Sequence, residues 1–255
     1  MCDNPLKKKI DIQSINHTFF DGYKAITNLS LSIYPGEFII LAGKNGSGKT
    51  TLLRHLNGLL LPDSGEILVN GKSVSKHLVE TRKRVGMVFQ DADTQIVADT
   101  VFDDAAFGLE NLKYKRDQIN NKVLKALEKL NLLHLKDRNP STLSGGEKRK
   151  LAIAGILVMD PEVILFDEPL SNLDYPGTLQ ILSTIIELNR SGHTVVIATH
   201  DVETLIDKAT RIIIMDKGEI KKDGRPEEMI KFLEPSGVRE PCSSKFGLGI
   251  QPWTS

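Results

Sequence analysis

The chain has 255 residues, of which 40% are hydrophobic and 26% charged, and its formal net charge at pH 7 is zero. This length accommodates one substantial α/β domain with a small appendage, and the composition is that of an ordinary globular protein. Zero net charge provides no overall positive field to hold a nucleic-acid backbone, which argues against that class of partner. The two cysteines form no metal-binding or disulfide pattern, so we expect a reducing, intracellular setting.

Membrane-spanning and secretory segments are not expected. No apolar stretch approaches the roughly 20 residues that cross a bilayer, and the N-terminus, Met1 to Lys9, is followed by no apolar run of the secretory kind. If the chain serves a membrane process, we expect it to act from the water side, through a partner.

The first part of the chain predicts an antiparallel β layer. Its candidate strands alternate between apolar and polar residues over 10–14, 30–33 and 66–69, with turn signals at Asp21-Gly22 and Asn70-Gly71. Three later strands are continuous apolar runs, typical of parallel strands covered on both faces, over 36–43, 161–168 and 193–200. Helical patterns lie between them, over 50–60, 116–132, 146–159 and 177–190. Residues 99–139 predict a helical insertion, and the residues beyond Pro235 a tail or linker.

A glycine-rich loop follows the first continuous strand. It matches the P-loop pattern with Gly43, Lys44, Asn45, Gly46, Ser47, Gly48, Lys49 and Thr50, and Thr51 continues the set. Glycines let the backbone present a ring of N–H donors to phosphates, and the following helix adds the positive end of its dipole. Lys49 would reach the β- and γ-phosphates, and the Thr50 hydroxyl would ligate Mg²⁺. A plain glycine turn is the alternative, but the strand before and the leucine-rich helix after favour a phosphate site.

Two carboxylates, Asp167 and Glu168, end the second continuous strand. Ligands of open parallel sheets bind beyond the carboxyl ends of strands, so this pair and the glycine loop can share one edge. Asp167 would hold Mg²⁺, directly or through water, and Glu168 would orient or deprotonate an attacking water. A solvated acidic turn before Pro169 is the alternative.

A second glycine motif opens the helical pattern near residue 146. Ser144, Gly145, Gly146 and Glu147 combine capping-box spacing with two bare glycines. A good helix start would explain the motif by itself, but exposed N–H groups at a helix tip also suit an anion. The chain would then have two sites suited to phosphate. This suggests a dimer, in which the second glycine motif of one copy closes over the γ-phosphate held by the other copy.

Taken together, the motifs over residues 10–233 resemble the ATP-binding-cassette (ABC) ATPase family. The resemblance implies an α/β fold: a P-loop NTPase (RecA-like) core with a parallel sheet, an N-terminal antiparallel β subdomain and an inserted α-helical subdomain. It implies an ABC ATP-binding domain over 1–235, with its core at about 1–88 and 161–235 and the helical subdomain at about 89–160. Residues 236–255 would be a C-terminal tail.

The resemblance also implies roles for single residues. Phe19 would stack on adenine, although it could instead be a core or turn aromatic. Gln90 would touch Mg²⁺ and report the nucleotide state to a membrane partner, or be a plain surface residue. Residues 171–174 would cross a dimer interface. His200 would contact the γ-phosphate and steady Glu168, although a histidine at a strand end is usually structural.

Residues 85–96 and 104–112 resemble the energy-coupling-factor branch, which imports cobalt, nickel or vitamins. The chain departs from that branch at Ala92, Leu170 and Glu147, none of which removes a catalytic group. The resemblance implies an ATPase that uses ATP and Mg²⁺, pairs with itself or a paralogue, and drives integral membrane transporter subunits from the cytoplasmic face of the cell membrane. The alternatives are a soluble, non-transport ABC ATPase of the DNA-repair or translation type, or a module that binds nucleotide without hydrolysing it.

Overall fold

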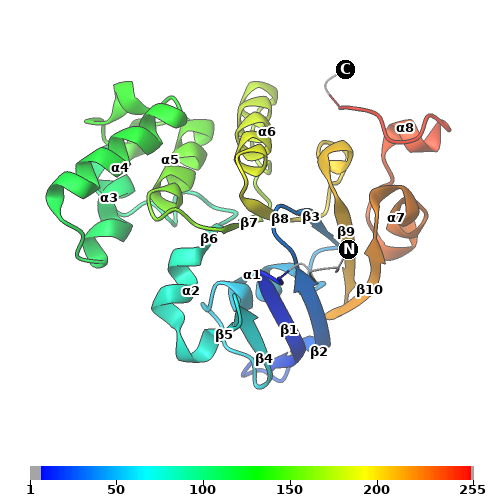
Figure 1. Ribbon diagram of the computed structural model, residues 1–255. Helices are drawn as coiled ribbons and strands as arrows, with labels where there is room; N and C mark the ends of the chain where they lie inside the picture. The colour runs from blue at the N-terminus through cyan, green and yellow to red at the C-terminus, as the bar shows by residue number, and fades with distance from the viewer. Residues whose placement is uncertain (1–6, 254–255) are drawn as a thin grey trace, which may run out of the picture.

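The smaller of two β-sheets forms the base of the molecule in Figure 1, which shows a computed structural model that describes residues 7–253. This sheet is antiparallel, with the strand order β2-β1-β4-β5. Its strands are β1 (Ile10–Thr18), β2 (Lys24–Ile33), β4 (Ser64–Val69) and β5 (Lys72–Ser73). The predicted antiparallel layer is confirmed, although β1 and β2 are longer than their alternating segments. Ser14, at φ 47°, lies in a register irregularity that breaks the alternation of β1 without ending the strand.

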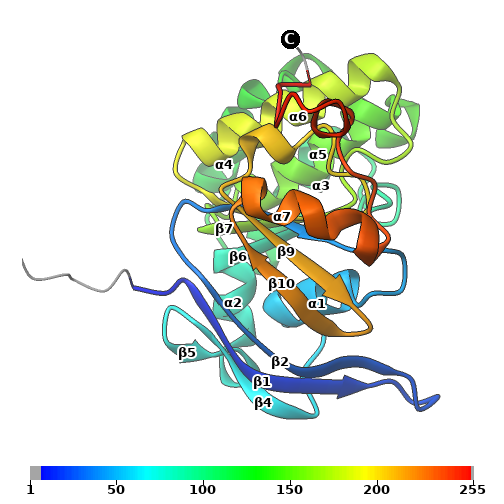
Figure 2. The same ribbon diagram turned by 90° about the vertical axis from the view of Figure 1, so that its right-hand side faces the viewer.

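The larger sheet lies above the first and has the strand order β10-β9-β3-β8-β7-β6 (Figure 2). Its strands are β3 (Phe38–Ala42), β6 (Val85–Val88), β7 (Val163–Asp167), β8 (Thr194–Thr199), β9 (Arg211–Asp216) and β10 (Glu219–Gly224). All neighbours are parallel except β10, which returns antiparallel to β9. The three continuous apolar runs are therefore parallel strands, as predicted.

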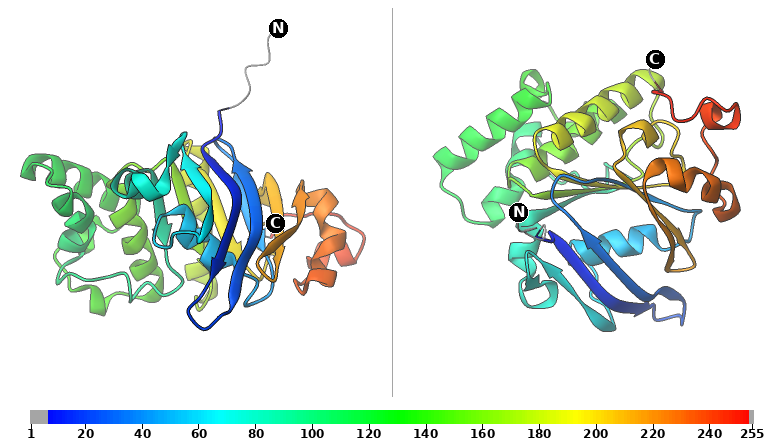
Figure 3. Two further views of the ribbon diagram at one scale, coloured as in Figure 1. Left: turned by 90° about the horizontal axis from the view of Figure 1, so that it is seen from below. Right: turned by 45° about the vertical axis from the view of Figure 1, so that its right-hand side comes forward.

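Helices lie on both faces of the larger sheet and beyond its edges. They are α1 (Lys49–Leu56), α2 (Leu78–Arg84), α3 (Val101–Asn111), α4 (Arg116–Lys129), α5 (Gly145–Leu157), α6 (Tyr175–Arg190), α7 (Pro226–Leu233) and α8 (Cys242–Lys245). Short 3₁₀ turns lie at Val74–Lys76, Leu133–Leu135, Pro140–Thr142, Ile206–Lys208 and Glu234–Ser236. Helix α1 lies between the two sheets, and α3, α4 and α5 gather beyond the β6 edge (Figures 1 and 3).

Helix α1 ends earlier than its sequence pattern predicts. The prediction ran to Leu60, but the helix ends at Leu56. Gly58 has a φ of 72°, the left-handed conformation that commonly terminates helices, and the leucines beyond it continue only the apolar pattern.

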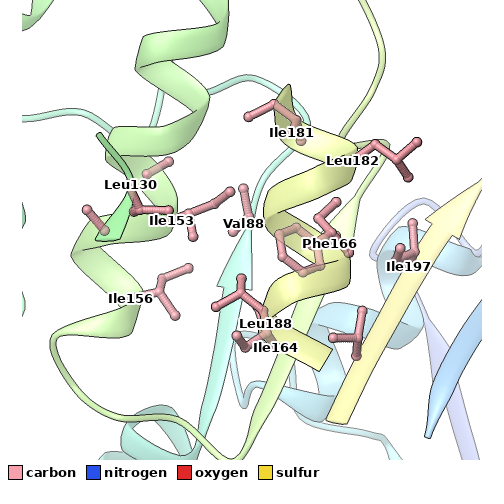
Figure 4. Packing of buried hydrophobic residues seen from close by; sticks show 14 of the residues in the cluster. Val88, Leu130, Ile153, Ile156, Ile164, Phe166, Ile181, Leu182, Leu188 and Ile197 are labelled. Carbon is pink, nitrogen blue, oxygen red and sulfur yellow. The ribbon is translucent and has the colours of Figure 1, made fainter. Parts of the chain in front are cut away.

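Two hydrophobic cores lie on opposite faces of the larger sheet. One fills the space between this sheet and the antiparallel sheet, with α1 embedded in it. The other packs the opposite face against the helical layer, where Phe166 and Ile164 meet side chains of α5 and α6 (Figure 4). Val163 and Leu165 alternate with these residues and enter the first core. Each buried aliphatic or aromatic side chain contributes about 1.5–3 kcal/mol, so the strand carrying Asp167 is held firmly from both sides.

The segment after Pro235 packs onto the molecule, although its sequence predicts a tail or linker. The Cys242 amide donates to the Glu203 carboxylate (2.9 Å), and the Trp253 ring lies 5.5 Å from the Tyr175 ring, centroid to centroid. The division into residues 1–235 and a tail over 236–255 remains a prediction. Residues 1–6 and 254–255 of those ranges, Cys2 among them, lie outside the described part of the chain.

Candidate functional site

The strand register brings four predicted segments to one edge of the larger sheet. Ala42 of β3 is level with Thr199 of β8, and Ala198 of β8 is level with Asp167 of β7. Val88 of β6 is level with Phe166 of β7. Because all four strands are parallel, the residues that follow them emerge together at their carboxyl ends. The glycine loop, Gln90, the carboxylate pair and His200 therefore share one edge, as the sequence predicted for the loop and the pair.

The glycine loop leads directly from β3 into α1. Gly48 has a φ of 102°, and a methyl group there would lie 2.7 Å from the Ala25 carbonyl oxygen. At Gly43 a methyl group would lie 2.4 Å from the Met215 carbonyl oxygen. Both positions require glycine, because neighbouring backbone leaves no room for a side chain. The loop is therefore held tightly against its own chain at Gly43 and Gly48.

Lys49, the first residue of α1, is 6% exposed. Its ammonium donates to the carbonyl oxygens of Gly43 (2.6 Å) and Lys44 (3.1 Å). Burial lowers the pKa of Lys49, and the nearby carboxylates of Glu168 and Asp167 oppose that shift. The cation is thus held under the loop, beside two carboxylates that offset its charge.

The next residue, Thr50, meets the first carboxylate. Its hydroxyl donates to Asp167 Oδ1 at 2.9 Å. Asp167 is buried, which raises the pKa of its carboxyl group, while the Thr50 hydrogen bond acts in the opposite direction. Two hard oxygen ligands, one hydroxyl and one carboxyl, therefore lie side by side, and this is the donor chemistry that Mg²⁺ prefers.

The second carboxylate, Glu168, is 9% exposed and is held by two residues at the end of β8 and beyond it. His200 Nδ1 lies 2.8 Å from Glu168 Oε1, and the Thr199 hydroxyl donates to Oε2 at 3.2 Å. Glu168 has a φ of 46°, an uncommon conformation for a residue with a side chain. This backbone conformation turns the chain just as the strand ends and is typical of functional sites.

One cleft joins these groups. It is lined by Tyr23, Asn45, Gly46, Ser47, Gly48, Lys49, Thr50, Thr51, Gln90, Asp167, Glu168 and His200. The sequence predicted all of them except Tyr23, whose hydroxyl donates to the Gly46 carbonyl (2.9 Å) from the β1–β2 hairpin. The signal that could have found Tyr23 is an aromatic residue directly after the Asp21-Gly22 turn.

Apart from the second glycine motif, three predicted binding residues do not line the cleft. Phe19 packs edge-on against His17, with ring centroids 4.8 Å apart. The Lys44 side chain reaches Asp216 Oδ1 at 3.0 Å, and Gly43 lies behind the loop against Met215 and Ser47. The adenine-stacking role of Phe19 remains a prediction.

The second glycine motif lies outside the cleft, at the tip of α5. Ser144 caps the helix by accepting from the Glu147 amide (3.3 Å), and Glu147 Oε2 accepts from the Ser144 amide (2.8 Å). The Ser144 hydrogen bonds hold the pKa of Glu147 below its usual value. The capping box is thus present, and the tip with Gly145 and Gly146 does not meet Lys49 within the chain.

Neither a complete metal cage nor a membrane span occurs in the described chain. Among residues 7–253, no three or more His, Cys, Asp or Glu side chains are grouped so that they could hold a metal ion. Within the same residues, every helix is too short or too polar to cross a bilayer.

Comparison with known proteins gives matches along most of the chain. The family model described as ABC transporter matches residues 26–171. An energy-coupling factor transporter ATP-binding protein of Methanospirillum hungatei is 46% identical over 228 residues, covering 88% of this chain and 57% of that protein. A putative ABC transporter ATP-binding protein of Methanosarcina mazei is covered to 53%, so the chain spans about half the length of the first curated relatives it matches.

Two solved structures have the same fold. CbiO1 of Clostridium perfringens, part of the ABC transporter complex CbiONQ, has a TM-score of 0.81 and 33% identity, covering 94% of this chain and 99% of that one. An ATP-binding cassette solved as a dimer in a post-hydrolysis state with ADP and Pi has a TM-score of 0.76 and 28% identity, covering 85% and 98%. The predicted fold class is confirmed.

Proposed function

Since this chain belongs to the ABC transporter family, we propose that it binds and hydrolyses ATP and that it powers a membrane transporter in partnership with a second ATPase subunit. The relatives confirm the family and the energy-coupling-factor branch that the motifs resemble. The observation that carries the proposal is the convergence of Lys49, the Thr50–Asp167 pair and the Glu168–His200 pair in one cleft.

In the proposed mechanism the cleft holds the triphosphate. The loop amides from Gly43 to Thr51 and the Lys49 ammonium bind the phosphates, so Lys49 exchanges its carbonyl partners for phosphate oxygens. Thr50, Asp167 and Gln90 would hold Mg²⁺, which supplies charge neutralisation to the phosphates when bound. With too few protein ligands for a closed cage in the described residues, the remaining ligands would be phosphate and water oxygens.

Water activation falls to Glu168 in this mechanism. Its carboxylate lies beside the cleft and is oriented by His200 and Thr199, so it is placed to accept a proton from an attacking water. The His200 side chain is 54% exposed and lines the cleft, and it would also contact the γ-phosphate. Catalysis then consists of positioning and electrostatic stabilisation, as in phosphoryl transfer generally.

The separation between the cleft and the α5 tip supports a dimer. Ser144, Gly145, Gly146 and Glu147 would close over the γ-phosphate bound by the other subunit, a second copy or a close paralogue, and residues 171–174 would cross the interface. The dimeric cassette with ADP and Pi supports this assembly, because it has the same fold.

The cargo and partners follow from the branch. We propose an importer of the energy-coupling-factor type for cobalt, nickel or a vitamin, with this chain at the cytoplasmic membrane face, bound to integral membrane subunits. The names of the relatives and the membership of CbiO1 in a transporter complex support this assignment.

The central experiment compares Glu168→Gln with the wild type. We expect the wild type to hydrolyse ATP only with Mg²⁺, and the variant to bind ATP, lose at least about a hundredfold in kcat, and accumulate as an ATP-bound dimer in size-exclusion chromatography. Glu66→Gln, an exposed exchange on β4, is the matched control and should behave as wild type. Wild-type turnover in Glu168→Gln would remove the proposed role of Glu168. Membrane proteins that co-purify with the chain would test the transporter assignment.

A further inference from the structure

Arg149 lies in the second turn of α5 and is only 4% exposed. Its guanidinium donates to three main-chain carbonyl oxygens that belong to two different loops. Nη1 donates to Phe89 (3.0 Å) and Gln90 (2.6 Å), and Nη2 donates to Ser171 (3.3 Å). One buried side chain therefore joins the helix of the second glycine motif to two loops of the nucleotide cleft.

The energetic setting of Arg149 is unusual. Among the described residues no carboxylate forms an ion pair with Arg149, and its Nε atom has no hydrogen-bond partner there. Burial lowers the pKa of the guanidinium, and only the charge of Asp91 opposes this shift. Burying a cation costs several kcal/mol unless it is well hydrogen-bonded, so the carbonyl groups of the two loops are its main compensation. Displacing either loop would leave the cation poorly satisfied.

Both loops carry groups of the cleft. The first contains Gln90, which lines the cleft. The second follows Glu168, and the Ser171 amide (3.2 Å) and hydroxyl (2.8 Å) both donate to the Glu168 carbonyl oxygen. A continuous set of hydrogen bonds thus runs from α5 through Arg149 to Gln90 on one side and to the backbone of Glu168 on the other.

We infer that Arg149 is a positioning residue that couples the α5 tip of each chain to Gln90 and Glu168 of the same chain. This inference rests on the proposed function, in which the tip binds the nucleotide of the second subunit. A helix transmits displacement along its length, so movement of the tip by that contact shifts Arg149 and, with it, both loops. Engagement of one nucleotide is thereby coupled to the geometry of the other cleft.

Arginine suits this role better than lysine. Its planar guanidinium presents five donors in a fixed fork, so it can bind two loops simultaneously, whereas an ammonium is a compact point charge on a flexible stem. The neighbouring Lys148 provides a contrast, because it pairs with Asp93 of the first loop alone (2.6 Å) and at the surface.

The experiment measures kcat, KM and nucleotide binding for Arg149→Met, Arg149→Lys and the matched control Lys148→Ala, each with and without Gln90→Ala. We expect Arg149→Met to lower kcat about tenfold, the effect of one lost charge-assisted interaction, with little change in KM or ATP affinity. Arg149→Lys should lose about threefold, and Lys148→Ala less than twofold. In the Gln90→Ala background the loss caused by Arg149→Met should shrink to about threefold or less, because one of the two cleft groups through which Arg149 acts is then already removed.

Equal losses with and without Gln90→Ala would overturn the coupling, and so would a Lys148→Ala loss as large as that of Arg149→Met. If thermal unfolding shows that Arg149→Met does not fold, Arg149→Lys takes its place. Equal losses of kcat for Arg149→Lys with and without Gln90→Ala would then overturn the coupling. If the wild type lacks Mg²⁺-dependent hydrolysis, the proposed function and this inference are both overturned. If the wild type hydrolyses ATP but the losses of kcat from Arg149→Met and Gln90→Ala are additive, only the inference is overturned.

Discussion

Two helices of this protein follow or begin with glycine-rich segments, the loop before α1 and the tip of α5, and these glycines are used in opposite ways. At α1 the chain itself demands glycine, because a methyl group at Gly43 or Gly48 would lie under 3 Å from neighbouring carbonyl oxygens. At the α5 tip a methyl group at Gly145 or Gly146 would meet only ordinary contacts at 3.7 Å. Gly43 and Gly48 thus build a site within the chain, whereas no contact among the described residues requires glycine at Gly145 or Gly146.

The difference indicates where each ligand comes from. Glycine in a helix is less stable than alanine by up to about 1 kcal/mol, so bare glycines with room around them point to something that approaches from outside. The capping box supports this view, because Ser144 and Glu147 stabilise the tip without covering the glycines. On this basis we propose that the α1 loop forms a phosphate pocket within one chain and that the α5 tip is half of a site that a second subunit completes.

The largest loss of stability is expected for Gly48→Ala. The left-handed backbone and the 2.7 Å approach to Ala25 should cost about 1–3 kcal/mol and remove ATP binding, as measured by urea unfolding and nucleotide titration. Gly36→Ala is the matched control, since Gly36 has a φ of 75° but nothing within 4 Å, and should lose only about 1 kcal/mol. Equal losses would show that crowding at α1 is unimportant.

A loss of about 1 kcal/mol is expected for Ser144→Ala, which removes the N-cap of α5. Thr100→Ala removes the corresponding cap of α3 and should cost a similar amount. Only Ser144→Ala should also weaken ATP-dependent dimerisation, measured by light scattering in the Glu168→Gln background. Dimerisation weakened by both variants would mean that the α5 tip has no special role.

A smaller change in stability, a gain rather than a loss, is expected for Asp167→Asn, which tests the α1 pocket. Burial raises the pKa of Asp167 above its ordinary value of 3.8, so between the two pKa values the folded chain binds more protons than the unfolded chain. The contribution of Asp167 to stability therefore falls as pH rises through this window. Asp167→Asn should be more stable at pH 7 and lose stability less steeply between pH 4 and 7 in urea unfolding.

Burial also raises the pKa of Asp104, which contributes the same pH dependence to the wild type and to Asp167→Asn. The difference between wild type and variant therefore isolates Asp167. If Asp167→Asn lost stability with pH as steeply as the wild type, Asp167 would not be the source of the pH dependence. Mg²⁺-dependent hydrolysis at the wild-type rate would contradict the proposed role of Asp167 as a Mg²⁺ ligand.

The smallest change in stability is expected for Gly146→Ala. The open space at the tip predicts a change within about 0.5 kcal/mol for the isolated chain. The added methyl group should nevertheless obstruct the partner's nucleotide and abolish ATP-dependent dimerisation. Dimerisation unaffected by Gly146→Ala would contradict the comparison between the glycine loop and the α5 tip.

Most of the cleft could be predicted from sequence because its residues follow the apolar strands that position them. Lys49, Asp167 and His200 each lie within a few residues of the end of such a strand, and parallel pairing brings those ends together. Local pattern and one rule of sheet geometry were sufficient for this part of the site and for three strands of each sheet, whereas β5, β6, β9 and β10 were not among the predicted strands.

The remainder depends on contacts between distant segments. Arg149 lies about 60 residues from Gln90, and a charged residue in a helix gives no local signal of burial. Tyr23 joins the cleft only because the β1–β2 hairpin reaches over the glycine loop. The segment around Trp253 lacks periodicity, since its contacts are single side chains rather than the repeating face of a helix.

The contact between Trp253 and Tyr175 provides the protein with a built-in optical probe. Trp253 is the only tryptophan in the chain, and Tyr175 directly follows the segment 171–174 at the start of α6. All indole emission therefore originates from one place, next to residues proposed to meet the second subunit. Subunit pairing can accordingly be timed in unlabelled protein by stopped-flow fluorescence, without introducing a dye.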